Sequence, residues 1–235
     1  MNTPGGFGEY IRVPSSWAIA LPNYLSAKEA MSLGTAGLTA GLSVHALASY
    51  REYIGLSDTK SIVTGATGGV GSVAVMLLSK LGSEVTAVTG KSDQLGFLSS
   101  IGASHVLSRE ELVEAARKPI GKSIWDVGID VVSGDILSLL LTSLKPGGAV
   151  ACSGLVGGHS FESSILPFIL RGNALLGIDS VEISIEAKTH IWEHFSSDWK
   201  INLDHSTKEI VLEDLKEEIE TILGGGQVGR VLVQL

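Results

Sequence analysis

Cysteine is almost absent from this chain, which has a single one, Cys152, among its 235 residues. One thiol cannot form a disulfide within the chain, and no cysteine pair is available for a metal site. We therefore assign no metal ligands from the sequence. The cysteine content fits a reducing compartment, and we expect a cytoplasmic protein.

Long apolar runs are also missing. No apolar stretch reaches the roughly 20 residues that a membrane-spanning helix needs, so no membrane contact is predicted. The first six residues, Met1 to Gly6, have neither a basic region nor an apolar core. They do not predict a secretory signal.

Positive charge is scarce: 17 Lys and Arg stand against 25 Asp and Glu, a net charge of −8 at pH 7. Residues 1–120 hold 9 of each kind, whereas residues 121–235 hold 8 basic and 16 acidic residues, so the whole net charge lies in the second half. This balance argues against nucleic acid as a ligand. We interpret the acidic half as a solvated surface that aids solubility.

Glycine, by contrast, is abundant, and three glycines follow one another at a spacing of three residues. Gly65, Gly68 and Gly71 stand between an apolar run over 61–64 and a predicted helix over 69–81. Glycine tolerates positive φ and lets a pyrophosphate approach the backbone closely. The first amides of the helix and its dipole would attract the phosphates. We expect a nucleotide site here, and a turn that serves packing alone is the alternative.

Strands and helices then alternate regularly. The pattern predicts strands over 85–89, 105–107, 127–132 and 148–153, and helices over 94–101, 109–118 and 136–144. Repeated strand–helix units with apolar strands indicate an α/β fold, a doubly wound parallel sheet of the Rossmann type. A methyltransferase of similar fold is a weaker alternative, because glycines at this spacing suit a dinucleotide pyrophosphate.

The two ends of the chain have other patterns. Two short strands are predicted over 10–13 and 17–21. The capping box Ser26-Ala27-Lys28-Glu29 starts a helix that Gly34 interrupts and that resumes over 38–53. His45 lies in this helix and is interpreted as a surface or packed residue. Towards the carboxyl end we expect helices over 185–195 and 212–223 and a closing strand over 230–235.

The residues after the second predicted strand favour NADP over NAD. An acidic residue at this point would bind the ribose hydroxyls and repel a 2′-phosphate, whereas this chain has Thr89-Gly90-Lys91-Ser92. Arg109, after the third strand, is a candidate second cation. The alternatives are that Lys91 is simply solvated and that Arg109 pairs with a neighbouring glutamate.

Five motifs together resemble one family. They are Gly34-Thr35-Ala36-Gly37-Leu38-Thr39-Ala40, Val63-Thr64-Gly65-Ala66-Thr67-Gly68-Gly69-Val70-Gly71, Pro167-Phe168-Ile169-Leu170-Arg171-Gly172, Gly177-Ile178-Asp179-Ser180-Val181 and Gln227-Val228-Gly229-Arg230. In this order they are similar to the zinc-independent medium-chain dehydrogenase/reductases, in particular the quinone oxidoreductase and acryloyl-CoA reductase branch. Zinc members carry a ligand cysteine near the first motif, and no such ligand stands here.

The resemblance implies an enzyme that holds NADPH between a nucleotide domain and a GroES-like domain and passes hydride to an electron-poor double bond. The acceptor would be a small molecule, either an enoyl thioester such as acryloyl-CoA or a quinone. The resemblance assigns no catalytic residue. Carried over by position, the cofactor-binding residues are Thr35, Gly65, Thr67, Gly68, Gly69, Val70, Thr89, Gly90, Lys91, Arg109, Leu155, Ser180 and Arg230.

The resemblance also implies a division of the chain. We expect a remnant of the GroES-like domain over 1–30, the NADP-binding domain over 31–175 and a carboxyl-terminal part of the catalytic domain over 176–235. Family members are about a third longer, and the part without a counterpart is expected at the amino end. The chain is then either a reductase or a truncated homologue that binds NADP without chemistry. The apolar stretch 161–176 is a candidate homodimer surface or ordinary core.

Overall fold

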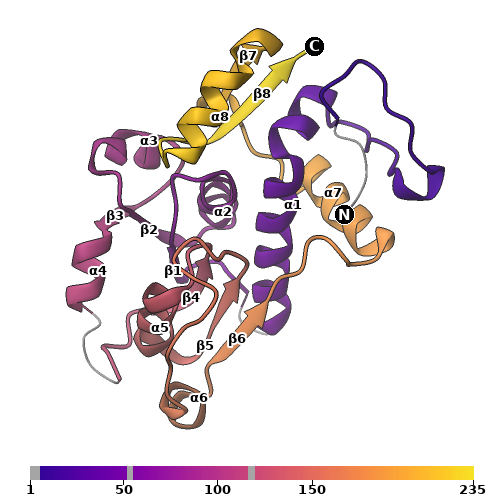
Figure 1. The fold of residues 1–235 in the computed structure, drawn as a ribbon. Helices are drawn as coiled ribbons and strands as arrows, with labels where there is room; N and C mark the ends of the chain where they lie inside the picture. Colours follow the sequence, from indigo (N-terminus) through magenta and orange to yellow (C-terminus); the bar gives the residue numbers. More distant parts are fainter. Residues whose placement is uncertain (1–5, 52–54, 116–119) are drawn as a thin grey trace.

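A six-stranded parallel sheet lies at the centre of the computed structural model, which describes residues 6–51, 55–115 and 120–235. Its order is β3-β2-β1-β4-β5-β6 (Figure 1). The chain order reverses beside β1, as in dinucleotide-binding sheets, so the predicted fold class is confirmed. The strands are β1 (Lys60–Val63), β2 (Glu84–Thr89), β3 (His105–Ser108), β4 (Trp125–Asp130), β5 (Leu144–Cys152) and β6 (Ala174–Gly177).

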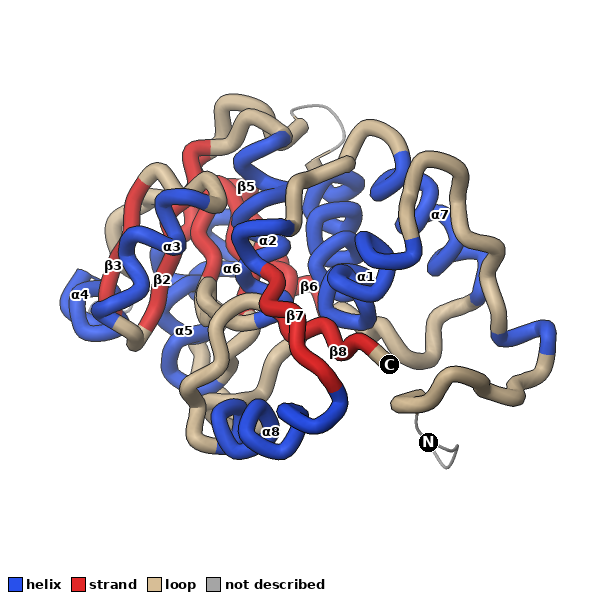
Figure 2. Tube along the Cα trace, turned by 90° about the horizontal axis from the view of Figure 1, so that it is seen from above, coloured by secondary structure: helices blue, strands red, loops and turns tan. Residues whose placement is uncertain are grey.

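Helices cover both faces of this sheet because both faces are apolar (Figure 2). Val63 of β1 packs into a core with α1, α2 and α3, whereas its neighbour Ile62 points to the opposite core with α4, α5 and α6. Successive strand residues face opposite sides, so one strand contributes to both cores. The helices are α1 (Ala27–Tyr50), α2 (Gly69–Lys80), α3 (Leu95–Ser100), α4 (Arg109–Ala115), α5 (Gly134–Ser143) and α6 (Leu166–Arg171).

The first helix begins and bends where the sequence predicts. The Ser26 hydroxyl accepts from the Glu29 amide at 3.1 Å, and the Glu29 carboxylate accepts from the Ser26 amide at 2.7 Å, which completes the capping box. Gly34 has φ 51° and ψ −154°, a conformation that interrupts the helix. α1 ends at Tyr50, and the predicted helix end at Tyr53 lies outside the described residues. The same holds for residues 116–118 of the predicted helix over 109–118.

The carboxyl-terminal part contains α7 (Ile185–Ser196), β7 (Thr207–Val211), α8 (Leu215–Leu223) and β8 (Arg230–Gln234). Both helices and the closing strand were predicted. β7 was not predicted, and it pairs in parallel with β8 to form a separate two-stranded sheet. α1 contacts both α7 and β8, so this part packs against the first helix (Figure 1).

The amino-terminal strands predicted over 10–13 and 17–21 are wrong. Residues 6–25 contain a single 3₁₀ turn, Ser15–Trp17, and no strand. Figures 1 and 2 both show this segment extending away from the central sheet. Tyr10 is 93% exposed. Short extended pieces need a neighbouring strand for their backbone hydrogen bonds, and β7 and β8 pair with each other instead.

Within the described residues, no helix combines the length and the apolar character that crossing a membrane would require.

The packing of α2 on the turn after β1 yields a prediction for stability. A Cβ on Gly71 would lie 2.3 Å from the Gly65 carbonyl oxygen, which is backbone and cannot rotate away. We expect Gly71→Ala to lower the free energy of unfolding by about 1–3 kcal/mol, the usual cost of overpacking. The matched control is Gly96→Ala in α3, where a Cβ meets nothing within 4 Å. Denaturant unfolding should show the control unchanged or slightly more stable; equal stability of the two variants would contradict the argument.

Candidate functional site

The glycine-rich turn leads from β1 directly into α2. Gly65 has φ 57°, and its carbonyl accepts from the Gly68 amide at 2.9 Å, which closes the turn. Gly68 is the N-cap of α2 and makes no side-chain cap hydrogen bond. The first amides of α2 therefore remain available to an anion, as at other helix N-termini that bind phosphate.

Polar and basic groups from the ends of β2 and β3 gather beside this turn. The Thr67 and Thr89 hydroxyls are 3.4 Å apart, and the Lys91 amide donates to the Thr89 hydroxyl at 3.0 Å. The Arg109 guanidinium lies against Gly90, with one nitrogen 3.0 Å from the place where a Cβ would stand. A hollow of about 260 Å³ is enclosed here, lined by Thr64, Gly65, Thr67, Val88, Thr89, Gly90, Lys91, Arg109, Val132, Ile136 and Gly225.

The carboxyl-terminal tail closes over the same turn. The Gly229 amide donates to the Thr67 carbonyl at 2.8 Å, and the Lys91 ammonium donates to the Gln227 carbonyl. Burial lowers the pKa of Lys91, and the nearby Asp93 carboxylate opposes that shift. A cation in this position has a carbonyl partner and no carboxylate of its own in the hollow. An anionic ligand would supply the missing charge.

Arg230 places a third cation near the turn, beside the start of α2. Its Nε donates to the Ser32 carbonyl at 3.0 Å, and its terminal nitrogens lie 2.7 Å and 3.0 Å from the Cβ positions that Gly69 and Gly34 lack. Burial lowers the pKa of Arg230. No ion pair of Arg230 occurs among the residues that the structure describes. Side chains at either glycine would occupy the space that the guanidinium uses.

The structure thus distributes the predicted cofactor residues over several places. Six of them, Gly65, Thr67, Thr89, Gly90, Lys91 and Arg109, line the hollow beside the turn. Thr35 and Arg230 line another hollow of about 640 Å³ between α1, α8 and β8. The remaining five, Gly68, Gly69, Val70, Leu155 and Ser180, line neither hollow.

Of those five, Leu155 and Ser180 are not part of the glycine turn or of α2. The Thr39 hydroxyl donates to the Thr35 carbonyl at 2.8 Å and lies 2.9 Å from the Ser180 hydroxyl, so Ser180 is connected to the kinked start of α1. Leu155 is 70% exposed, in the loop after β5. The roles of all thirteen residues stay predictions.

Sequence reasoning missed Asp130, which fixes the turn from behind. Its carboxylate is fully buried at the end of β4, where it accepts from the Thr64 hydroxyl at 2.6 Å and the Ser133 amide at 2.8 Å. Thr64 directly precedes Gly65, so these hydrogen bonds hold the entry to the glycine turn. The available signal was an acidic residue within the apolar strand predicted over 127–132.

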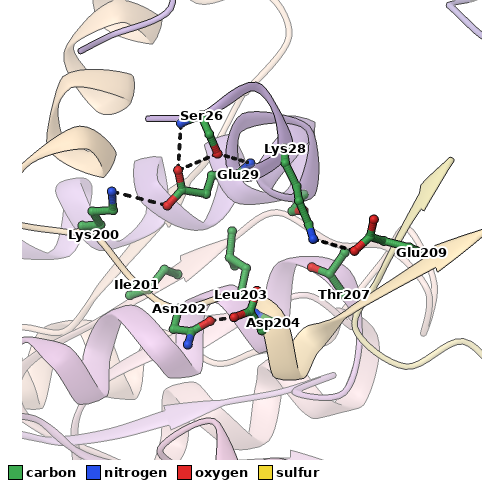
Figure 3. Close-up of a pocket in the computed structure, with 11 residues that line it drawn as sticks. Ser26, Lys28, Glu29, Lys200, Ile201, Asn202, Leu203, Asp204, Thr207 and Glu209 are labelled. Carbon is green, nitrogen blue, oxygen red and sulfur yellow. Dashed lines mark hydrogen bonds and ion pairs between the residues drawn. The ribbon is translucent and has the colours of Figure 1, made fainter. Parts of the chain in front are cut away.

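A larger hollow of about 890 Å³ lies below the start of α1 (Figure 3). Both of its lysines are already paired: Lys28 with Glu209, and Lys200 with Glu29 at 3.4 Å. These exposed pairs connect α1 to β7 and to the segment before it, and such pairs contribute about 1 kcal/mol or less each. Because no cation here lacks a partner, we place no anionic ligand in this hollow.

Comparison with known proteins gives consistent matches. The family profile described as "Zinc-binding dehydrogenase" matches residues 69–197, from the first residue of α2 to the residue after α7. "Putative quinone oxidoreductase YhfP" of Bacillus subtilis (strain 168) is 45% identical over 239 residues, which cover 100% of this chain and 71% of that protein. "Acrylyl-CoA reductase AcuI" of Ruegeria pomeroyi is 38% identical over 232 residues, which cover 98% of this chain and 70% of that protein.

Solved structures agree with these sequences. The yhdH oxidoreductase from Salmonella enterica in complex with NADP has a TM-score of 0.92 at 39% identity and covers 98% of this chain and 70% of that one. Bacillus subtilis yhfP with NAD bound has a TM-score of 0.90 at 43% identity, covering 95% and 68%. The chain therefore belongs to the zinc-independent medium-chain dehydrogenase/reductases, an oxidoreductase family, within the branch of the quinone oxidoreductases and acrylyl-CoA reductases.

Proposed function

We propose that this protein is an NADPH-dependent oxidoreductase that transfers hydride to an electron-poor double bond. The observation that carries the proposal is the hollow beside the glycine turn. Lys91 and Arg109 line it next to the turn that leads into α2, and none of the described residues that line it is a carboxylate. Two cations and a row of backbone amides fit the phosphates of a dinucleotide. The Salmonella relative, whose structure is a complex with NADP, supports this choice.

The residues present fit such a cofactor at both of its charged parts. A Cβ on Gly68 would approach the Gly65 carbonyl oxygen at 3.3 Å, and Gly69 leaves space that Arg230 fills from the other side. The pyrophosphate would therefore take the amides of α2 with Arg230 nearby, and the 2′-phosphate would take Lys91 and Arg109. NAD is the alternative, since the Bacillus relative was crystallised with NAD bound.

The chemistry belongs to the nicotinamide, which supplies the hydride when the cofactor is bound. This chain's residues would orient that ring and shield it. Thr35 and Ser180 are joined through Thr39, so their positions are set by hydrogen bonds rather than by solvent. We propose that they and Arg230 lie along the nicotinamide, with Leu155 on its outer side. The acceptor would be an enoyl thioester or a quinone, the substrate classes named in the relatives.

A second candidate function is cofactor binding without chemistry. The hollow that contains Thr35 and Arg230 is lined on its outer side by apolar residues that remain open to solvent, among them Phe7 (64% exposed), Met31 and Ile222. Each relative has about 30% of its length without a counterpart in this chain. An acceptor held in this hollow would lack one wall unless further residues cover it.

We also propose a homodimer through the segment over 161–176. The structure places α6 and the edge strand β6 there, with Ile165, Ile169 and Leu170 each more than 60% exposed. The outer edge of a sheet beside exposed apolar side chains is a frequent subunit contact.

The cofactor preference can be tested at Lys91. We expect Lys91→Glu to weaken NADPH binding by about 1–3 kcal/mol, because a charge-assisted contact to the 2′-phosphate is lost and a like charge replaces it. NADH binding should change less. Fluorescence titration with both cofactors measures the difference, and Lys122→Glu, an exposed lysine outside the hollow, is the control. Equal losses for NADPH and NADH would refute the assignment of Lys91 to the 2′-phosphate.

The glycine turn can be tested at Gly68. We expect Gly68→Val to abolish binding of NADPH with only a modest fall in the melting temperature. The φ of −78° suits any side chain, although a Cβ would stand 3.3 Å from the Gly65 carbonyl oxygen. A branched side chain would stand where the pyrophosphate must approach the backbone. Calorimetric titration and thermal unfolding of the same sample separate the two effects. Retained binding with a lowered melting temperature would support a turn that serves packing alone.

Catalysis can be tested by covering the open hollow. Hydride transfer needs the acceptor carbon within about 3–3.5 Å of the nicotinamide, and such positioning supplies roughly 7–11 kcal/mol of the barrier reduction. We expect little oxidation of NADPH by acryloyl-CoA or a small quinone with this chain alone, and a large gain after extension with a relative's amino-terminal part. Robust turnover by the chain alone would show that the cover is dispensable. No turnover by either form would favour the non-catalytic candidate.

A further inference from the structure

Three histidines from two helices meet on the side of α1 that faces α7. His45 comes from α1, and His190 and His194 lie one turn apart on α7. One ring nitrogen of each lies within 4.8 Å of the other two. The rings of His190 and His194 are 4.6 Å apart and nearly perpendicular, and those of His45 and His190 are 5.2 Å apart at a similar angle. These residues are separate from the hollow beside the glycine turn.

We propose that this cluster is a binding site for a divalent transition-metal ion, with Zn²⁺ as the preferred occupant. Imidazole nitrogens are ligands of choice for Zn²⁺, and two histidines four residues apart on one helix face are a recurrent way of presenting them. This site departs from the expectation, based on cysteine content, that the chain offers no metal ligands.

The distances fit tetrahedral coordination. Two nitrogens bound to Zn²⁺ at 2.0–2.1 Å in a tetrahedral arrangement stand about 3.3–3.4 Å apart. The Nε2 atoms of His190 and His194 are 3.3 Å apart in the structure. His45 offers the third nitrogen, since all three ligand atoms lie within 4.8 Å of one another.

The orientation of His194 is fixed by contacts that do not involve the ion. Its Nδ1 is 2.8 Å from an Asp198 carboxylate oxygen, and its ring stacks on Trp199 at 4.4 Å with an angle of 17°. A carboxylate that accepts from Nδ1 leaves the Nε2 lone pair as an acceptor, which is the usual arrangement behind a metal-bound histidine. In the structure this Nε2 shares a hydrogen bond with His190 Nε2, which an ion between the two nitrogens would replace. Asp198 is therefore a positioning residue of the site.

The site is open enough for an ion to enter. His190 is exposed and borders a surface hollow with the segment over 18–24, so water can complete the coordination. His45 is partly buried, whereas His190 is exposed. A neutral imidazole offers its lone pair at neutral pH. Binding would join α1 to α7 and stabilise the contact between the sheet domain and the carboxyl-terminal part.

Calorimetric titration of the tag-free full chain with ZnCl₂ tests the proposal. We expect one Zn²⁺ per chain, at least a tenfold weaker affinity for His190→Gln, and roughly 10–100-fold weaker affinity for Asp198→Asn, the usual cost of losing a carboxylate behind a ligand. His190 and Asp198 are both well exposed, so neither variant should impair folding. His205→Gln, outside the cluster, is the matched control and should bind as the unchanged chain does.

Two further measurements complete the test. Co²⁺ should give the visible absorption of a tetrahedral site with the unchanged chain and not with His45→Gln, and Zn²⁺ should raise the melting temperature of the unchanged chain but not that of His190→Gln. Mg²⁺, which prefers oxygen ligands, should do neither. Absence of Zn²⁺ binding, or equal affinity in the unchanged chain and His190→Gln, would overturn the proposal and leave a hydrogen-bonded histidine cluster.

Discussion

The approach of α2 to the end of β1 constrains the candidate site more than any other contact. The backbone of the turn and the first turn of α2 come so close that no side chain fits at Gly71, and Gly65 adopts positive φ to allow it. This packing aims the unpaired amides of α2 past the carboxyl ends of β1 and β2. From behind, the buried Asp130 carboxylate holds Thr64, so the turn is fixed at both its entry and its exit. The amides are in place before any ligand arrives, which reduces the entropy cost of binding.

The charge around the glycine turn is positive, whereas the chain as a whole is negative. The protein carries a net charge of −8, yet Lys91, Arg109 and Arg230 gather near the turn and the start of α2. Among the residues that the structure describes, no acidic side chain lines the hollow there. Burial of Lys91 and Arg230 is unfavourable for their charged forms, as the lowered pKa of each shows. Cations kept in partly buried places without carboxylate partners are better explained by an anionic ligand than by folding stability. Surface acidity elsewhere would then direct anions to this edge of the sheet.

Local pattern predicted five of the six strands of the central sheet, all but β6, because each of those strand–helix units is encoded by its own residues. The glycine turn, the capping box and the break at Gly34 depend on contacts within a few residues, and the structure has all three. The amino-terminal strands failed because a strand over 10–13 depends on a partner that the pattern cannot supply. β7 was missed because its residues, Thr207–Val211, are mostly polar and exposed and so form no apolar run. Long-range placement also hid Asp130, since only the fold brings its carboxylate to Thr64.

Helix α1 contacts β7, Ser180 and α7, and so joins the sheet domain to the carboxyl-terminal part. Before its kink it carries the capping box and the Lys28–Glu209 pair, which reaches β7. After the kink it carries Thr39, bonded to Ser180, and His45, which meets His190 of α7. A shift of α7 along α1 would disturb both contacts, because the part of α1 after the kink holds one side of each. A metal ion bound at the histidines would restrict that sliding.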